Sequence, residues 1–134
     1  MPTAPQDGAD NRRVILLAED EPVVRRFVDT ALTYAGYHVL VASDGVQALQ
    51  VSRAYEGTIH LVLSDIKMPN MIGPELASAI AKERPGIRVL LMTGQSSGEV
   101  PQQLRQELLR KPFLPTQLLE KIAQTLSSDD SSRK

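Results

Sequence analysis

Short apolar runs alternate along the chain with longer segments in which apolar residues recur at helical spacing. The runs are rich in Val, Ile and Leu and span residues 14–18, 38–42, 59–64 and 88–92, with a weaker fifth at 107–110. Runs that are apolar at almost every position indicate strands buried on both faces, as in a parallel sheet. The pattern therefore predicts five parallel strands.

The segments between the strands predict helices that each carry one apolar face. The clearest are 22–35, 45–55, 74–83 and 115–126, whereas 95–105, with Ser, Gly and Pro inside it, is the poorest candidate. Pro22 suits the first turn of a helix, and Gly36 suits a helix end. The alternation predicts an α/β fold, a doubly wound five-stranded parallel sheet with helices on both faces.

The 134 residues fit one domain with a sizeable core. We expect the folded domain over residues 12–127, because the periodic pattern lies within that range. Residues 1–11 mix Pro, Gly and Asp without periodicity and predict a flexible lead, and residues 128–134 predict a flexible tail.

Composition narrows the classes of function. The net charge of −1 gives no basic surface, so we expect no direct binding of nucleic acid. The absence of Cys excludes disulfides, thiol catalysis and thiolate metal sites, and an aromatic content of 4% is too low for a base- or flavin-stacking platform. No apolar run approaches membrane-spanning length and the first residues have no signal-peptide core, so we expect a cytoplasmic protein without membrane contact.

Polar residues stand where the predicted strands end, and functional residues of a doubly wound sheet gather at the carboxyl ends of its strands. Glu19-Asp20-Glu21 follow the first strand, Asp65 the third, Thr93 the fourth and Lys111 the fifth. Clustered carboxylates repel one another, and Mg²⁺ relieves that repulsion with oxygen ligands. Asp65 would then be the nucleophile of a phosphoryl transfer, with Thr93 and Lys111 donating to the phosphoryl oxygens.

Each of these features alone has an ordinary structural explanation. The acidic stretch can be a solvated loop or a helix N-cap, Asp65 and Thr93 can be turn residues, and Lys111-Pro112 can be a loop pair. Their occurrence together at successive strand ends favours the chemical interpretation over coincidence.

Four strings in this order and spacing resemble the response-regulator receiver domain, the phosphoacceptor module of two-component signalling. They are ILLAEDEPVVR, LVLSDIKMPNMIGPEL, LLMTG and LLRKPF, and the resemblance covers roughly residues 12–127. It implies the flavodoxin-like receiver fold. It also implies that a histidine kinase or phosphotransfer protein donates a phosphoryl group to Asp65, and that the domain signals by a change of conformation.

The resemblance implies roles for the acceptor and its metal ligands. Asp65 matches the phosphorylated aspartate. Glu19 and Asp20 match the acidic pair that holds Mg²⁺, with Asp65 and the backbone carbonyl of Lys67 as further ligands. We therefore expect Mg²⁺ to be the cofactor of phosphorylation.

The resemblance also implies roles around the phosphoryl group. Thr93 matches the hydroxyl that moves toward it, and Lys111 matches the lysine of the family, with a cis bond expected before Pro112. Gly73 would shape the loop after the third strand by adopting backbone angles that other residues resist. Gly94 would leave space for the phosphoryl group and its donor.

The sequence departs from the family pattern at several positions. Leu108 stands where receivers usually carry a Tyr or Phe that turns inward on activation. Leu108 is either an ordinary core residue or a sign that this domain signals through a different surface change or mainly relays phosphate. Glu19 replaces the commoner Asp, and we expect metal binding to survive. The segment between Thr93 and Lys111 is shorter than usual, and His60 is interpreted as a strand-start residue rather than a ligand.

Other classes of protein share this architecture but need residues that the chain lacks. A phosphatase of the haloacid-dehalogenase type needs a second Asp two residues after its nucleophile, where this chain has Lys67. A flavodoxin-like FMN binder needs a glycine- and hydroxyl-rich phosphate loop, where this chain has the acidic stretch EDEP. A degenerate receiver would lack an acceptor residue, and none is missing.

The resemblance further implies how the protein acts. We expect phosphorylation from phosphodonors and slow autodephosphorylation rather than the turnover of an enzyme, and a monomer or weak dimer. The alternative within the family is a receiver module of a hybrid sensor histidine kinase, which acts as a phosphorelay intermediate.

Overall fold

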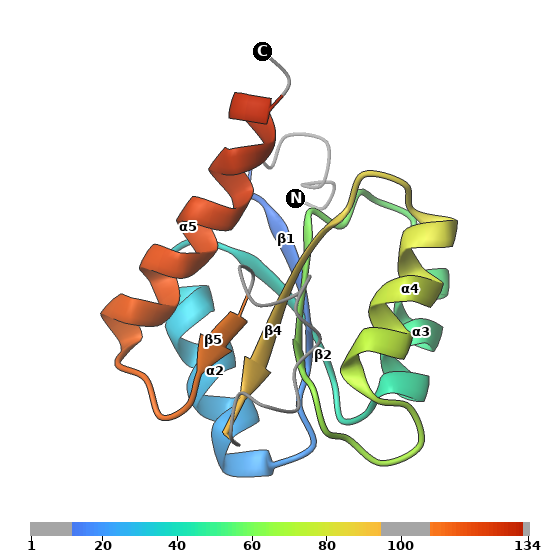
Figure 1. The fold of residues 1–134 in the computed structure, drawn as a ribbon, viewed down its shortest axis with the longest axis horizontal. Coiled ribbons are helices and arrows are strands. Elements are labelled where there is room, and N and C mark those ends of the chain that lie inside the picture. Colours follow the sequence, from blue (N-terminus) through green and yellow to red (C-terminus); the bar gives the residue numbers. More distant parts are fainter. Residues whose placement is uncertain (1–11, 95–107, 133–134) are drawn as a thin grey trace, which may run out of the picture.

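The computed structural model describes residues 12–94 and 108–132, with side chains up to residue 127. Its strands form one parallel sheet in the order β2-β1-β3-β4-β5 (Figure 1). They are β1 (Val14–Ala18), β2 (His38–Ala42), β3 (Leu61–Asp65), β4 (Arg88–Thr93) and β5 (Leu108–Arg110). The five-stranded parallel sheet is confirmed.

Helices cover both faces of this sheet (Figure 1). They are α2 (Pro22–Tyr34), α3 (Gly45–Ala54), α4 (Gly73–Glu83) and α5 (Pro115–Ser132). Helices α2 and α5 share one hydrophobic core with the sheet, and α3 and α4 share the other. The doubly wound α/β fold is therefore confirmed.

The two cores explain why the strands are apolar at nearly every position. Ile15 and Leu17 of β1 belong to the core that contains Ile122 of α5. Leu16, between them, belongs to the core that contains Ile80 of α4. Successive side chains of a strand point to opposite faces of the sheet. A strand that is covered on both faces therefore needs apolar residues at odd and even positions alike.

Two boundaries differ by more than one residue from those predicted. The third strand begins at Leu61 rather than at residue 59, and Asp65 is its last residue. The last helix continues past residue 126 to Ser132, so the expected flexible tail is helical up to that residue. The stretch SSDDSS contains no Gly or Pro, and a helix that is already packed can propagate through it. The expected flexible lead at 1–11 and the weak helix candidate at 95–105 lie outside the described residues.

The ends of α2 follow the signals in the sequence. Pro22 is its first residue, and Gly36 comes after its end with a φ of 103°, a left-handed conformation that favours glycine. The chain then enters β2 at His38. Pro22 and Gly36 thus define the start and the end of α2.

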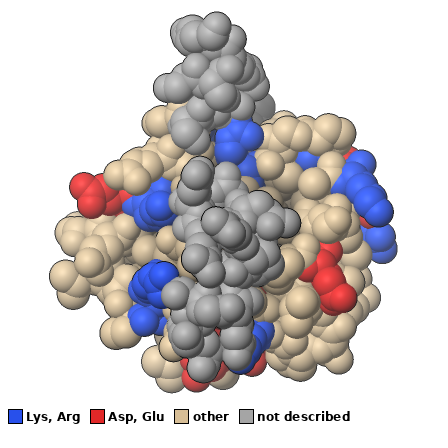
Figure 2. Space-filling view, viewed as in Figure 1, with Lys and Arg blue, Asp and Glu red and all other residues tan. Residues whose placement is uncertain are grey.

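Charged side chains of both signs are interspersed on the face drawn in Figure 2. This distribution agrees with the net charge of −1. Within the described ranges, none of the helices combines the length and the apolar character needed to cross a membrane.

Candidate functional site

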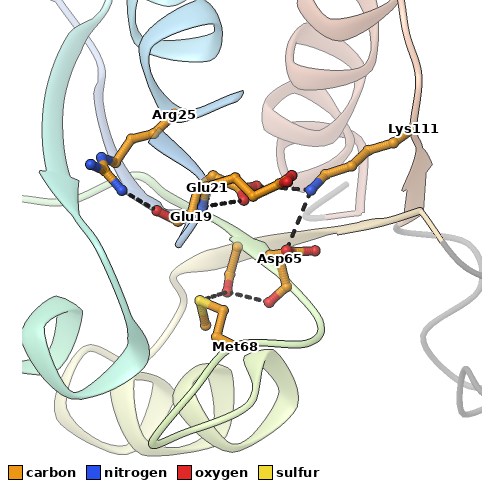
Figure 3. Close-up of polar contacts among 7 residues, drawn as sticks. Glu19, Glu21, Arg25, Asp65, Met68 and Lys111 are labelled. Atoms are coloured by element: carbon orange, nitrogen blue, oxygen red, sulfur yellow. Dashed lines mark hydrogen bonds and ion pairs between the residues drawn. The ribbon is translucent and has the colours of Figure 1, made fainter. Parts of the chain in front are cut away.

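The carboxyl ends of three strands bring acidic and basic side chains together (Figure 3). Glu19 and Asp20 directly follow β1, Asp65 ends β3, and Lys111 directly follows β5. The chain order of the strands reverses around β1, which lies between β2 and β3. Such a switch point is where doubly wound sheets bind their ligands.

Lys111 connects two of the carboxylates. Its Nζ lies 3.0 Å from Oε1 of Glu19 and 3.3 Å from Oδ2 of Asp65. The side chain of Glu19 is fully buried and that of Asp65 is 13% exposed. Since β4 separates β5 from β3 in the sheet, the lysine reaches across the end of β4 to both acids. Its charge offsets part of their mutual repulsion.

Two further hydrogen bonds hold Glu19 in its buried position. Its Oε2 accepts a hydrogen bond from the backbone N–H of Glu21 at 3.1 Å. Its backbone carbonyl accepts one from Nη1 of Arg25 at 2.9 Å (Figure 3). The interpretation as a solvated loop is therefore wrong for Glu19. Sequence reasoning missed Arg25, whose signal is a basic residue in the first turns of the helix after the acidic stretch.

Three carboxylates form a cluster that could hold a cation. One carboxylate oxygen from each of Glu19, Asp20 and Asp65 lies within 4.8 Å of the others. Hard oxygen donors with several negative charges are the donor set that Mg²⁺ prefers, so these residues fit the metal. Lys67 lies in the loop two residues beyond Asp65, with its side chain exposed.

The surroundings of Asp65 and Lys111 shift their pKa values. Burial, and next the charge of Glu19, raise the pKa of Asp65 to about 6, against the opposing effect of Lys111. Burial acts against the charge of Lys111, but its hydrogen bond to Glu19 and the charge of Asp65 outweigh burial and raise its pKa. Lys111 is therefore charged at neutral pH, and a cation beside Asp65 would favour the ionised carboxylate.

The register of the sheet places Thr93 between Asp65 and Lys111. Thr93 ends β4 and is 5% exposed. Asp65 pairs with Met92, the residue before Thr93. The carbonyl of Thr93 accepts a hydrogen bond from the N–H of Lys111 at 2.7 Å. The bond between Lys111 and Pro112 is cis, as predicted.

Gly73 is required for a different reason from the one predicted. It is absent from the residues with positive φ in the described ranges, whereas Asn70 of the same loop has a φ of 72°. A Cβ at Gly73 would lie 2.5 Å from the carbonyl oxygen of Asp65. Glycine therefore allows the start of α4 to approach the end of β3, and the unusual backbone angle falls on Asn70.

Two residues singled out from the sequence lie away from this cluster. Leu108 begins β5 and is partly buried, beside the core residue Leu109. His60 directly precedes β3, and its Nδ1 accepts a hydrogen bond from the N–H of Val14 at 2.9 Å. This contact gives His60 a structural role at the start of the strand.

Comparison with known proteins identifies the family. The model of the response regulator receiver domain matches residues 15–123. The chain belongs to this family. The response regulator receiver protein CpdR of Brucella abortus is 36% identical over 118 residues, which cover 84% of this chain and 95% of CpdR. The sensor kinase CckA of the same organism is 33% identical over 120 residues, or 87% of this chain but 13% of CckA.

Solved receiver structures agree with this assignment. The CheY-like receiver domain protein of Methanospirillum hungatei superposes with a TM-score of 0.80 at 29% identity, covering 91% of this chain and 99% of the other. The receiver domain therefore has the flavodoxin-like fold that the four strings implied. Receiver domains are signalling modules that pair with histidine kinases or phosphotransfer proteins and bind Mg²⁺ at an acidic pocket. The relatives include both a separate receiver protein and a kinase, and they do not favour the hybrid-kinase alternative.

Proposed function

We propose that this receiver domain accepts a phosphoryl group on Asp65 in a Mg²⁺-dependent reaction with a histidine kinase or phosphotransfer protein. The observation that carries the proposal is the meeting of three carboxylates and the ammonium group of Lys111 at one rim of the sheet. The side chain of Asp65 is partly exposed, so a donor can reach it.

The proposed transfer is a displacement at phosphorus. A carboxylate oxygen of Asp65 bonds to phosphorus as the P–N bond of phosphohistidine breaks, and the imidazole nitrogen keeps the electron pair. The product is an aspartyl phosphate. Glu19, Asp20 and Asp65, with the carbonyl of Lys67, would hold Mg²⁺, which when bound supplies positive charge facing the phosphoryl oxygens.

The protein's own donors would stabilise the transferred group. Nζ of Lys111 is already 3.3 Å from Asp65, and Thr93 ends the neighbouring strand. On Asp65 the phosphoryl group would carry about −1.5 to −2 charges in place of the single charge of the carboxylate, and it would compete with Glu19 for the ammonium group. The domain would signal by a shift of population toward the state in which Lys111 and Thr93 close on the phosphoryl group.

Exposed apolar side chains beside the site suit a protein donor. Val23 on α2 is 82% exposed, and Leu114, just before α5, is 63% exposed. Phe27 of α2 lines both a groove with Val23 and the hollow that contains Lys111. This surface continues into the site, so we propose that the phosphohistidine donor covers it during transfer.

Intact mass spectrometry tests the acceptor. After incubation with Mg²⁺ and acetyl phosphate, the wild type should gain one phosphoryl mass and Asp65→Asn should gain none. Asp29→Asn, which alters a carboxylate of α2 away from the cluster, should still gain it. A folded wild type that neither gains the mass nor binds beryllofluoride in the presence of Mg²⁺ would overturn the proposal.

Two phosphodonors test the docking surface separately. Val23→Glu should slow transfer from a phosphohistidine protein but not from acetyl phosphate, because only the protein donor contacts this surface. Val46→Glu, a matched change at a 40% exposed position on α3, should affect neither reaction. Equal rates for both variants with the protein donor would refute this assignment.

A further inference from the structure

The loop that carries Lys67 is fastened to the start of helix α3. Nδ2 of Asn70 donates a hydrogen bond to Oδ2 of Asp44 at 2.9 Å. The other oxygen, Oδ1, accepts from the N–H of Gln47 at 2.7 Å and caps the helix. Since carboxylate oxygens accept and amide nitrogens donate, the chemistry fixes which end of the Asn70 side chain faces Asp44. One carboxylate therefore binds the helix and the loop together.

The start of α3 and the loop also pack closely against each other at this point. Gly45 is buried against Met71, and a Cβ there would lie 2.6 Å from the carbonyl oxygen of Met71. Farther along the loop, the N–H of Gly73 donates to the carbonyl of Ile66 at 2.8 Å. The φ of 72° at Asn70 turns the chain between these contacts, and Asn adopts this conformation more readily than most residues. The loop is thus held at both ends and at its turn.

We infer that Asp44 and Asn70 are positioning residues for the metal site. The inference rests on the proposed function, in which the backbone carbonyl of Lys67 completes the carboxylate set around Mg²⁺. A backbone carbonyl moves with its loop, so the bond that fastens the loop also sets the position of this ligand. Asp44 lies two residues beyond the end of β2, and it thereby links the connection between β2 and α3 to the carboxylate cluster.

Mg²⁺ makes this positioning matter more than it would for a larger cation. Its ligands lie at about 2.0–2.1 Å in near-ideal octahedral geometry, and small displacements of one ligand weaken binding. Hydrogen bonds that orient metal ligands from outside are worth at least several-fold in affinity. The bond between Asp44 and Asn70 should therefore affect Mg²⁺ affinity more than it affects the stability of the fold.

Calorimetric titration of the whole chain with Mg²⁺ tests the inference with three variants. Asn70→Gly keeps the left-handed backbone and removes the amide, and it should raise the dissociation constant by about three- to tenfold. The exchange Asp44→Asn with Asn70→Asp swaps donor and acceptor at unchanged net charge, and it should restore affinity to within about twofold. Gln47→Ala removes the bonds of Gln47 to Ser43 at the same helix start, and it should leave affinity unchanged.

Further measurements on the same variants separate positioning from general damage. At saturating Mg²⁺, phosphorylation of Asn70→Gly by acetyl phosphate should return to within about twofold of the wild-type rate, because the chemical groups are intact. An unchanged dissociation constant for Asn70→Gly would overturn the inference, as would an equal loss in Gln47→Ala or an exchange variant no better than Asn70→Gly. A wild type that does not bind Mg²⁺ would instead overturn the metal assignment of the proposed function, and this inference with it.

Discussion

The ammonium group of Lys111 makes its shorter ion pair with Glu19, at 3.0 Å, and not with Asp65, at 3.3 Å. Glu19 stands where the family more often has Asp, and its additional methylene extends the reach of the carboxylate. Since the Glu19 side chain is fully buried, its ion pair with Lys111 contributes to the interior of the domain as well as to the site at the strand ends. In the proposed transfer, Lys111 would therefore have to leave a structural partner, Glu19, to bind the phosphoryl group.

Removing Lys111 should destabilise the fold through Glu19. Lys111→Met would leave a buried carboxylate without its ammonium partner and should lower the free energy of unfolding by about 2–3 kcal/mol in urea without Mg²⁺. Adding Glu19→Gln to the same chain should recover more than half of the loss, because the fully buried side chain of residue 19 is then uncharged. A double variant no more stable than Lys111→Met would contradict this account of the pair.

The raised pKa of Asp65 predicts that its ionised form destabilises the metal-free fold. The pKa is 3.8 in the unfolded chain and about 6 in the folded protein, so stability falls as pH rises between these values. Asp65→Asn should therefore raise the melting temperature in EDTA above pH 6 by about 2–4 °C, with a smaller gain at about pH 5. Saturating Mg²⁺ should stabilise the wild type more than the variant, and an equal metal response in both would count against Asp65 as a ligand.

His60 predicts a pH dependence of opposite sign. Burial, aided by the charge of Arg13, lowers its pKa below 6.5, and Nδ1 must be unprotonated to accept from Val14. Its contribution to stability is therefore complete above pH 6.5 and is lost as pH falls from there through the lowered folded pKa. His60→Asn offers an acceptor that does not titrate, so urea unfolding of the variant should lack this part of the acid loss. If the free energy of unfolding falls with decreasing pH by the same amount in both proteins, His60 is not the source of the acid loss.

Gly94 has room for a methyl group but not for a large side chain. A Cβ would lie 3.7 Å from Cδ of Lys111, an ordinary contact, so Gly94→Ala should be phosphorylated by acetyl phosphate within about twofold of the wild-type rate. Gly94→Leu should be slowed by about tenfold or more, because its branch competes with Lys111 for space. A time course of intact mass measures both rates, and equal rates for Ala and Leu would contradict the steric argument.

Arg84 should matter for stability and not for phosphorylation. Its guanidinium group donates to Oγ and the carbonyl of Ser52 and to the carbonyls of Tyr55 and Gly57, which fastens the connection between α3 and β3 onto the end of α4. Arg84→Lys cannot repeat this fork and should cost about 1–3 kcal/mol in urea unfolding. Arg53→Lys, in an exposed pair with Glu83, should change stability little. If folded Arg84→Lys reacts more slowly with acetyl phosphate, the connection between α3 and β3 does influence the site.

Local patterns in the sequence were sufficient to predict the layers of this fold. Apolar runs such as residues 14–18 are hydrophobic at odd and even positions because a hydrophobic core covers each face of the sheet. The sequence of each run shows this pattern without reference to the rest of the chain. Parallel strands then place their carboxyl ends at one rim, so Asp65, Thr93 and Lys111 could be grouped before any side chain was located.

Only the tertiary structure decided which of these groups touch. The bond between Lys111 and Glu19 joins residues 92 positions apart, and that between Asn70 and Asp44 joins residues 26 positions apart. The need for glycine at residue 73 comes from the approach of a strand end rather than from its own backbone angles. Periodicity reports which face of an element is buried, but the distance between two elements depends on the packing of the whole domain.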